Sequence, residues 1–179
     1  MPDFVSSHDS SRKWTPLPEW RKARIGGAGW TAAPVSGLHR LLVSGDLKAA
    51  QRALAPKAVN CGLWDNGGDG DLMIRIATDR ALIVISHLPK FEAGWNGKGF
   101  AVSLASDGWM AFEIGGDQIG DLIAQSSSAR IAAGSPSAAI SFAGIPVLLV
   151  RRDKQTALIH VEEGQAAYFW RWLERAVED

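Results

Sequence analysis

The sequence lacks several features that would assign it to a class of protein. It contains a single cysteine, Cys61, so it can form no intrachain disulfide and cannot build a metal site from cysteines. Lys and Arg together number 19, as do Asp and Glu, which gives no net charge. Nucleic acids and anionic membranes reward a strong positive excess, so we expect neither as a partner.

Long apolar runs are also missing. No uninterrupted apolar run reaches about 18 residues, the length that would indicate a transmembrane helix. Residues 1–14, MPDFVSSHDSSRKW, have no apolar centre of the kind found in secretory signals. From these two observations we expect a cytoplasmic protein.

Tryptophan, in contrast, is abundant. The chain has eight tryptophans among 179 residues, and this residue is enriched at protein interfaces. Core packing accounts for part of the set. It accounts less well for Trp14 and Trp20, which lie in a polar stretch interrupted by prolines.

We predict that residues 1–36 form an extended N-terminal arm. Prolines and glycines interrupt this segment, and its apolar residues do not keep the regular spacing of a helix or a strand. Two prolines exclude a regular helix between Trp14 and Trp20. The apolar side chains of the arm need a surface to cover, which is either the chain's own domain or a partner. We therefore take Trp14, Leu17, Trp20 and Trp30 as candidate partner-interface residues.

Two glycine-rich stretches have a composition that is found in binding loops. The cluster at 26–29 lacks the Lys-Ser/Thr pair of a phosphate-binding loop, so we do not expect a nucleotide there. The acidic stretch 65–71 fails the spacing of a calcium-binding EF-hand, since Gly67 stands at a ligand position. We interpret it as a solvated hairpin loop.

Residues 37–179 are predicted to form one α+β domain. Its expected helices are 47–55, capped by Asp46, a short helix opening near Asp117, and 164–177. The expected strands are 38–44, 58–64, 72–78, 81–86, 100–104, 109–114, 138–142, 145–151 and 157–161. This order indicates one motif used twice, in two similar halves with antiparallel-rich sheets.

The stretch 99–125 shows this pattern most clearly. Two predicted strands flank Ser106-Asp107-Gly108, whose residue types are favoured in turns. A helix with one apolar face follows. Asp117 lies where its charge favours the positive end of that helix.

Candidate chemical residues are few. The four histidines have no second ligand at a metal-binding spacing, and we interpret His39 and His160 as strand residues. His87 follows a strand end, a common place for a site residue, but a structural role is the preferred interpretation. We predict no catalytic, cofactor-binding or metal-binding residue on this chain.

Several stretches of residues 37–177 resemble the gamma subunit of heterotetrameric sarcosine oxidase. They are core and turn positions without a catalytic signature. The stretches are 76–84, Gly94-Trp95, 116–123, Ser135-Pro136-Ser137, 142–152 and the last helix with Tyr168, Trp170, Trp172 and Leu173.

The resemblance implies a fold like the folate-binding domains of the glycine-cleavage T-protein, with two swapped α+β halves. It implies a non-catalytic assembly subunit within an alpha-beta-gamma-delta complex, packing chiefly on alpha. That complex would oxidise sarcosine or another N-methyl amino acid. FAD, FMN, NAD and zinc would lie on the other subunits, with tetrahydrofolate as co-substrate.

A second function remains open, a stand-alone folate-binding protein of one-carbon transfer on the same fold. T-protein-like domains hold folate through a carboxylate, and Glu113 is the carboxylate of the matching strand that can be compared with it.

Overall fold

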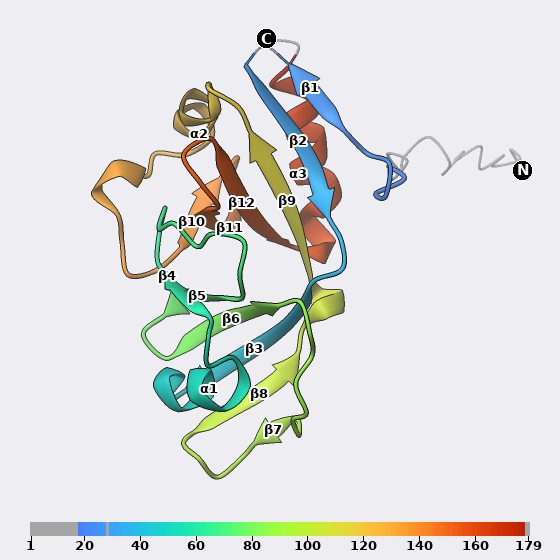
Figure 1. The fold of residues 1–179 in the computed structure, drawn as a ribbon. Helices are drawn as coiled ribbons and strands as arrows, with labels where there is room; N and C mark the ends of the chain where they lie inside the picture. Colours follow the sequence, from blue (N-terminus) through green and yellow to red (C-terminus); the bar gives the residue numbers. More distant parts are fainter. Residues whose placement is uncertain (1–17, 28, 178–179) are drawn as a thin grey trace, which may run out of the picture.

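Two six-stranded sheets and three α-helices make up the computed structural model, which describes residues 18–27 and 29–177. In Figure 1 one sheet lies above the other, and we call them the upper and lower sheets. Their strand orders are β1-β2-β9-β12-β11-β10 and β4-β5-β6-β3-β8-β7. Among the strand pairs of the described residues only β4–β5 is parallel, so the predicted antiparallel-rich α+β class is confirmed.

The lower half follows the predicted elements except at residues 94–95, a strand that was not predicted, and at 59–61, a strand that is shorter than the predicted strand 58–64. It consists of β3 (His39–Gly45), α1 (Leu47–Leu54), β4 (Val59–Cys61), β5 (Leu72–Ala77), β6 (Arg80–Ile85), β7 (Gly94–Trp95) and β8 (Phe100–Leu104). Asp46 caps α1 as expected, because its Oδ1 accepts a hydrogen bond of 3.0 Å from the backbone N–H of Ala49.

The upper half uses both ends of the described chain. It consists of β1 (Ile25–Gly27), β2 (Trp30–Val35), β9 (Trp109–Gly115), α2 (Ile119–Ser126), β10 (Ala139–Phe142), β11 (Ile145–Arg151), β12 (Thr156–Glu162) and α3 (Glu163–Arg175), with 3₁₀ turns η2 (Ser106–Gly108) and η3 (Ile131–Ala133). Helix α2 begins at Ile119, and Asp117 instead accepts a hydrogen bond from the side chain of Gln155.

The two halves repeat one arrangement of strands. The lower order β4-β5-β6-β3-β8-β7 matches the upper order β10-β11-β12-β9-β2-β1 position by position. In each half the last strand of the second hairpin arm, β6 or β12, pairs with a central strand, β3 or β9, that is followed by a helix. The halves differ at one strand pair, because β4 and β5 are parallel whereas β10 and β11 are antiparallel. The topology therefore agrees with the internal duplication predicted from the element order.

The halves also exchange a strand. In the upper sheet the neighbour of β9 is β2, which leads directly into β3 of the lower sheet. In the lower sheet the neighbour of β3 is β8, which leads through η2 into β9 of the upper sheet. The predicted strand–turn–strand unit at 99–114 thus connects two different sheets (Figure 1).

The predicted boundary of the arm at residue 36 differs from the structure. Residues 25–35 carry β1 and β2, and β2 pairs along β9 in the upper sheet. Pro34 is tolerated in β2. Together with the glycines at 26–29, it interrupts the alternation of apolar and polar residues by which a strand is recognised in the sequence. Residues 1–17 lie outside the described residues.

Equivalent glycines close the two strand exchanges. At the end of β3, a Cβ on Gly45 would lie 2.4 Å from the carbonyl oxygen of Gly99, just before β8. After β9, a Cβ on Gly116 would lie 2.2 Å from the carbonyl oxygen of Gly29, just before β2. All four glycines have positive φ angles.

The hydrogen bonds around these glycines repeat as well. Gly99 O accepts from Asp46 N at 2.8 Å, and Gly29 O accepts from Gln118 N at 3.1 Å. The N–H groups of Gly45 and Gly116 each donate at 2.8 Å to the turn that precedes the adjoining strand, at Asp79 and Gln155 respectively.

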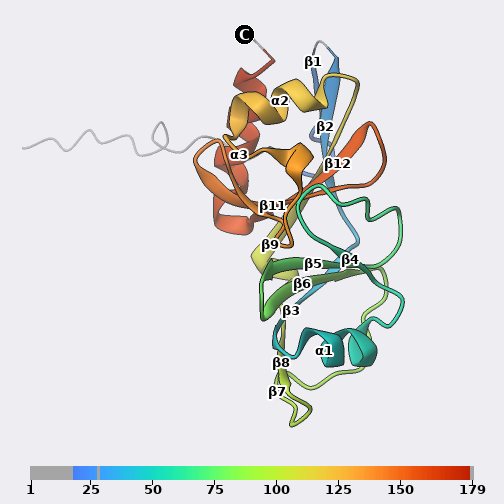
Figure 2. The ribbon, with the colours of Figure 1, turned by 90° about the vertical axis from the view of Figure 1, so that its left-hand side faces the viewer.

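Three apolar clusters fill the molecule. One lies between the upper sheet and helices α2 and α3, and a second lies between the lower sheet and α1 (Figure 2). The third joins the other faces of the two sheets, with Leu72, Ile74 and Leu82 from below and Leu148 and Leu158 from above. The sheets thus share an apolar interface.

The acidic stretch 65–71 is not a hairpin loop, because it connects the parallel strands β4 and β5. The chain turns toward the upper half just before and within this stretch: Leu63 N donates to Ser135 O at 2.8 Å, and Gly67 N donates to Arg151 O at 2.8 Å. The apolar side chains of Leu63 and Trp64, which pack on the upper core, explain this path.

We expect Gly45→Ala to lower the free energy of unfolding by about 3 kcal/mol, because the added Cβ meets a backbone carbonyl and the residue has φ +105°. Gly144→Ala is the matched control, since Gly144 has φ +83° but open space around it, and it should cost about 1 kcal/mol. Urea unfolding measures both. Equal losses of unfolding free energy in the two variants would mean that the close approach of Gly45 to the Gly99 carbonyl does not constrain the fold.

Candidate functional site

The predicted partner-interface residues that the structure describes pack on the chain's own domain. Trp30 is 6 % exposed and belongs to the upper core. Trp20 packs edge-on against Phe112 and Trp170, with ring centroids 5.8 Å apart in both pairs. These two residues therefore cover their own domain, while Trp14 and Leu17 lie outside the described residues.

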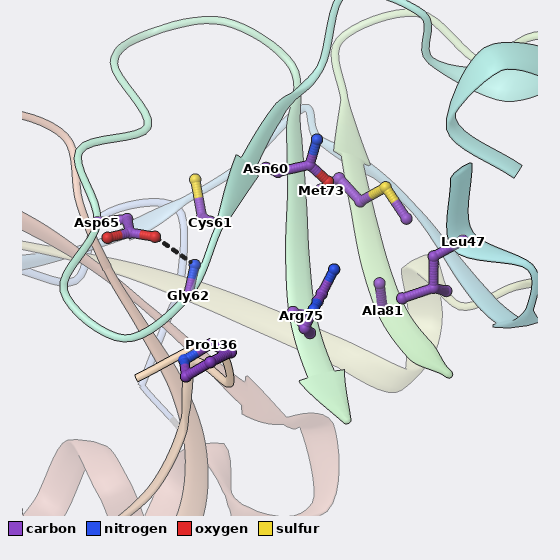
Figure 3. Close-up of a pocket in the computed structure, with 9 residues that line it drawn as sticks. All are labelled: Leu47, Asn60, Cys61, Gly62, Asp65, Met73, Arg75, Ala81 and Pro136. Carbon is purple, nitrogen blue, oxygen red and sulfur yellow. Dashed lines mark hydrogen bonds between the residues drawn. The ribbon is translucent and has the colours of Figure 1, made fainter. Parts of the chain in front are cut away.

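One cleft opens beside β4 and β5 and has a volume of about 180 Å³. Figure 3 shows Asn60, Cys61 and Asp65 on one side, with Arg75 nearby and Pro136 reaching in from the upper half. One oxygen of the Asp65 carboxylate, Oδ2, accepts a 2.8 Å hydrogen bond from Gly62 N. The cleft is smaller than the roughly 300–1,000 Å³ typical of ligand pockets.

Cys61 in this cleft is a buried free cysteine with a raised pKa. Burial, and secondarily the negative charge of Asp65, raise the pKa of its thiol to about 11. The nucleophilic form of cysteine is the thiolate, so the raised pKa disfavours a nucleophilic role for this thiol at neutral pH.

A second cleft of about 330 Å³ lies at the waist, where both strand exchanges cross from one half to the other. Its walls come from β2, β3, η2, β9, the start of α3 and the turn at Trp20. The lining residues are Trp20, Val35, Arg40, Ser106, Asp107, Trp109, Met110 and Glu163.

Arg40 is the buried charge of this waist cleft. The residue is only 5 % exposed, and its Nε has no hydrogen-bond partner within the described part of the chain. Its Nη1 makes one long contact of 3.4 Å to Leu38 O. Burial lowers the pKa of the guanidinium, and the charge of Glu163 acts in the opposite direction.

His160 lies behind Arg40, on the face of β12 that meets the lower sheet. It is fully buried, and neither ring nitrogen finds a hydrogen-bond partner among residues 18–27 and 29–177. Burial, and secondarily the charge of Arg40, lower the pKa of His160 to about 3. The ring is therefore neutral at physiological pH. The sequence correctly predicted that His160 lies in a strand. It did not predict that the ring is buried near the charge of Arg40.

Glu113, the residue compared with a folate-binding carboxylate, is held in an ion pair with Arg152. Arg152 also contacts Asp69 Oδ1 at 2.8 Å, so one guanidinium joins the upper sheet to the loop before β5. The carboxylate of Glu113 thus has a structural partner, and it does not line either cleft.

The remaining candidates show no clustering. His87 Nδ1 shares a 2.9 Å hydrogen bond with the neighbouring Ser86 hydroxyl. In the described ranges, no three His, Cys, Asp or Glu side chains gather in a way that could hold a metal ion. The described helices include none with the length and apolar character needed to cross a membrane.

Comparison with known proteins gives one kind of match. No family model matches the sequence, and no curated protein matches it. Among solved structures, the fold matches a chain of the heterotetrameric sarcosine oxidase from Corynebacterium sp. U-96, solved in complex with pyrrole 2-carboxylate. The TM-score is 0.65 at 18% sequence identity, and the match covers 86% of each chain.

The two chains share one fold. The match spans nearly the whole length of both, so the sarcosine oxidase chain has the same fold as this complete two-sheet unit and not only a piece of it. The resemblance to this complex, drawn from core and turn residues, is confirmed at the level of the fold.

The buried histidine should make stability depend on pH. His160 binds a proton in the unfolded chain near its ordinary pKa of about 6.5 but not in the folded protein, so stability is lost as pH falls from 6.5 toward 3. At pH 5.0 this loss amounts to about 2 kcal/mol.

His160→Leu should remove this loss. Relative to wild type, the variant should gain about 2 kcal/mol of unfolding free energy between pH 7.5 and 5.0, measured by urea titration. His87→Gln, a change at an exposed histidine, is the control and should follow wild type. If the unfolding free energies of His160→Leu and wild type differ by the same amount at both pH values, His160 is not the source of the pH dependence.

Proposed function

We propose that this chain is a subunit of a flavin-dependent oxidoreductase complex that oxidises sarcosine or another N-methyl amino acid. Its role in that complex is assembly, without an active site of its own. The observation that carries the proposal is the fold, which matches a chain of a heterotetrameric sarcosine oxidase over 86% of both chains.

The other parts of the proposal follow the sequence resemblance. Alpha, beta and delta subunits are the partners, with alpha as the chief contact. FAD, FMN, NAD and zinc belong to those partner chains, tetrahydrofolate is the co-substrate, and the complex works in the cytoplasm.

The exposed apolar side chains suggest where a partner contacts the domain. Trp95 in β7 is 69 % exposed, more than any other large apolar residue in the described ranges. β7 is the edge strand of the lower sheet and lies at the end of the molecule opposite β1 (Figure 1). An exposed tryptophan at a sheet edge supports a protein contact there, because such residues often dominate binding energy.

Isolation of the tagged chain from its native cells tests the proposal. We expect a yellow complex with larger and smaller partner chains, and mass spectrometry should place the flavin on another chain. A colourless protein without partners would contradict the proposal. It would favour the stand-alone folate-binding function, which titration with tetrahydrofolate would then examine.

Trp95→Ser should weaken capture of the partner chains by about 30-fold, equivalent to about 2 kcal/mol, because it removes an exposed aromatic anchor. Tyr168→Ser is the matched control, since Tyr168 is 53 % exposed on α3 of the other half, and it should leave capture unchanged. Binding is measured by titrating each variant against the purified partner complex. An equal loss for both variants would rule out a β7 interface.

A further inference from the structure

The segment at residues 64–71, which we call the clasp, ties the lower sheet to the upper one. It follows β4, reaches the end of β11 and then returns to β5. The Arg151 N–H donates to Asp65 O at 2.9 Å, and the Gly67 N–H donates to Arg151 O at 2.8 Å. These bonds form a parallel bridge beyond the part of β11 that pairs with β10. The clasp therefore occupies the edge of β11 where β10 has ended.

The clasp begins with a strained residue. Trp64 has a φ of +62°, in the left-handed region that bulky side chains rarely adopt. Two contacts from Arg151 hold it there. The Arg151 Nε donates to Trp64 O at 2.9 Å, and the guanidinium carbon lies 5.6 Å from the centre of the indole ring. Because a strained conformation persists only while its surroundings enforce it, loss of these contacts favours another path for the clasp.

Beyond Trp64 the clasp has few contacts that keep it closed. Residues 65–71 carry no apolar side chain that could anchor them in a core. Asp69 pairs with Arg152 Nε at 2.8 Å, but its side chain is 87% exposed, and exposed ion pairs contribute little to stability. Segments with few buried apolar contacts open at a lower free-energy cost than the core does.

The two ends of the clasp are held more firmly. Leu63, just before it, is 6% exposed in the upper core, and its N–H donates to Ser135 O at 2.8 Å. Leu72, just after it, is 2% exposed and begins β5. An opening motion can therefore be confined to the residues between these two leucines.

The clasp covers the thiol of Cys61. A Cβ on Gly67 would lie 3.2 Å from Cys61 Sγ, and Cys61 is only 1% exposed. Figure 3 shows the Cys61 side chain next to the loop that carries Asp65. Since the sequence has no other cysteine, the accessibility of this thiol reports whether the clasp is closed.

We propose that the clasp is a switch that opens as a local unit, with Leu63 and Leu72 as its fixed ends, while both sheets stay folded. Opening breaks the Arg151 and Arg152 contacts, releases Trp64 from its left-handed conformation and uncovers Cys61. The closed clasp blocks the edge of β11, and the open clasp leaves the backbone N–H and C=O of Arg151 free. This switch does not depend on assembly into a larger complex.

Labelling of Cys61 in the native full chain with a thiol reagent, at stepwise urea concentrations below the unfolding transition, tests the proposal. Local opening exposes little surface, so the labelling rate should change less than about twofold where the unfolding equilibrium constant rises about 100-fold. A rate that rises in parallel with that constant would mean that only global unfolding reaches Cys61, and it would overturn the proposal.

Arg151→Met should raise the labelling rate at least tenfold, because both contacts that hold Trp64 are lost, and the rate should stay insensitive to urea. Arg171→Met is the control and should label like wild type, since Arg171 pairs with Glu174 on α3, outside the clasp. An unchanged rate in Arg151→Met would mean that another motion, such as fraying of β4, uncovers Cys61, and it would also overturn the proposal.

Hydrogen exchange gives a readout that is independent of the thiol. The N–H groups of Leu63 and Gly67 both donate across to the upper half at 2.8 Å, but only Gly67 lies within the clasp. The protection factor of the Gly67 amide should therefore be at least tenfold lower than that of the Leu63 amide. Equal protection of the two amides would contradict an opening that is confined to residues 64–71.

Discussion

The structure depends on the close backbone contact that closes each strand exchange. Gly45 meets Gly99 in the lower half, and Gly116 meets Gly29 in the upper half, at distances that leave no room for a Cβ. These contacts fix where β8 and β2 begin against the central strands. Because β8 continues into β9 and β2 continues into β3, they also fix how the two halves are joined.

The exchange explains why the halves behave as one unit. A strand that completes one sheet leads into the centre of the other, so neither sheet is complete without the chain of both halves. The shared apolar cluster between the sheets and the contacts of Arg152 with Glu113 and Asp69 add to this coupling. The two crossing segments pass the waist, and the walls of its cleft come from both halves.

The waist is also where the fold buries polar groups. Arg40 and His160 are the two buried polar or charged residues of the described chain. Arg40 lies in β3 of the lower sheet, and His160 lies in β12 of the upper sheet. A shared fold carries many functions, and the match to a sarcosine oxidase chain does not by itself assign chemistry to this site. The chemistry follows from the residues that the exchange brings together.

The sequence alone determined most of the local elements, and their order predicted the duplication. Strand alternation, the Asp46 cap and the spacing of apolar residues in α2 act over a few residues, so they are readable without a structure. Only the tertiary structure decided that residues 25–35 complete the upper sheet, that β8 and β9 separate, and that Trp20 and Trp30 pack inward. It also decided the pairing of Arg152 with Glu113 and the burial of Arg40 beside His160, because these neighbours lie far apart in the chain and their contact depends on strand partners that no local pattern encodes.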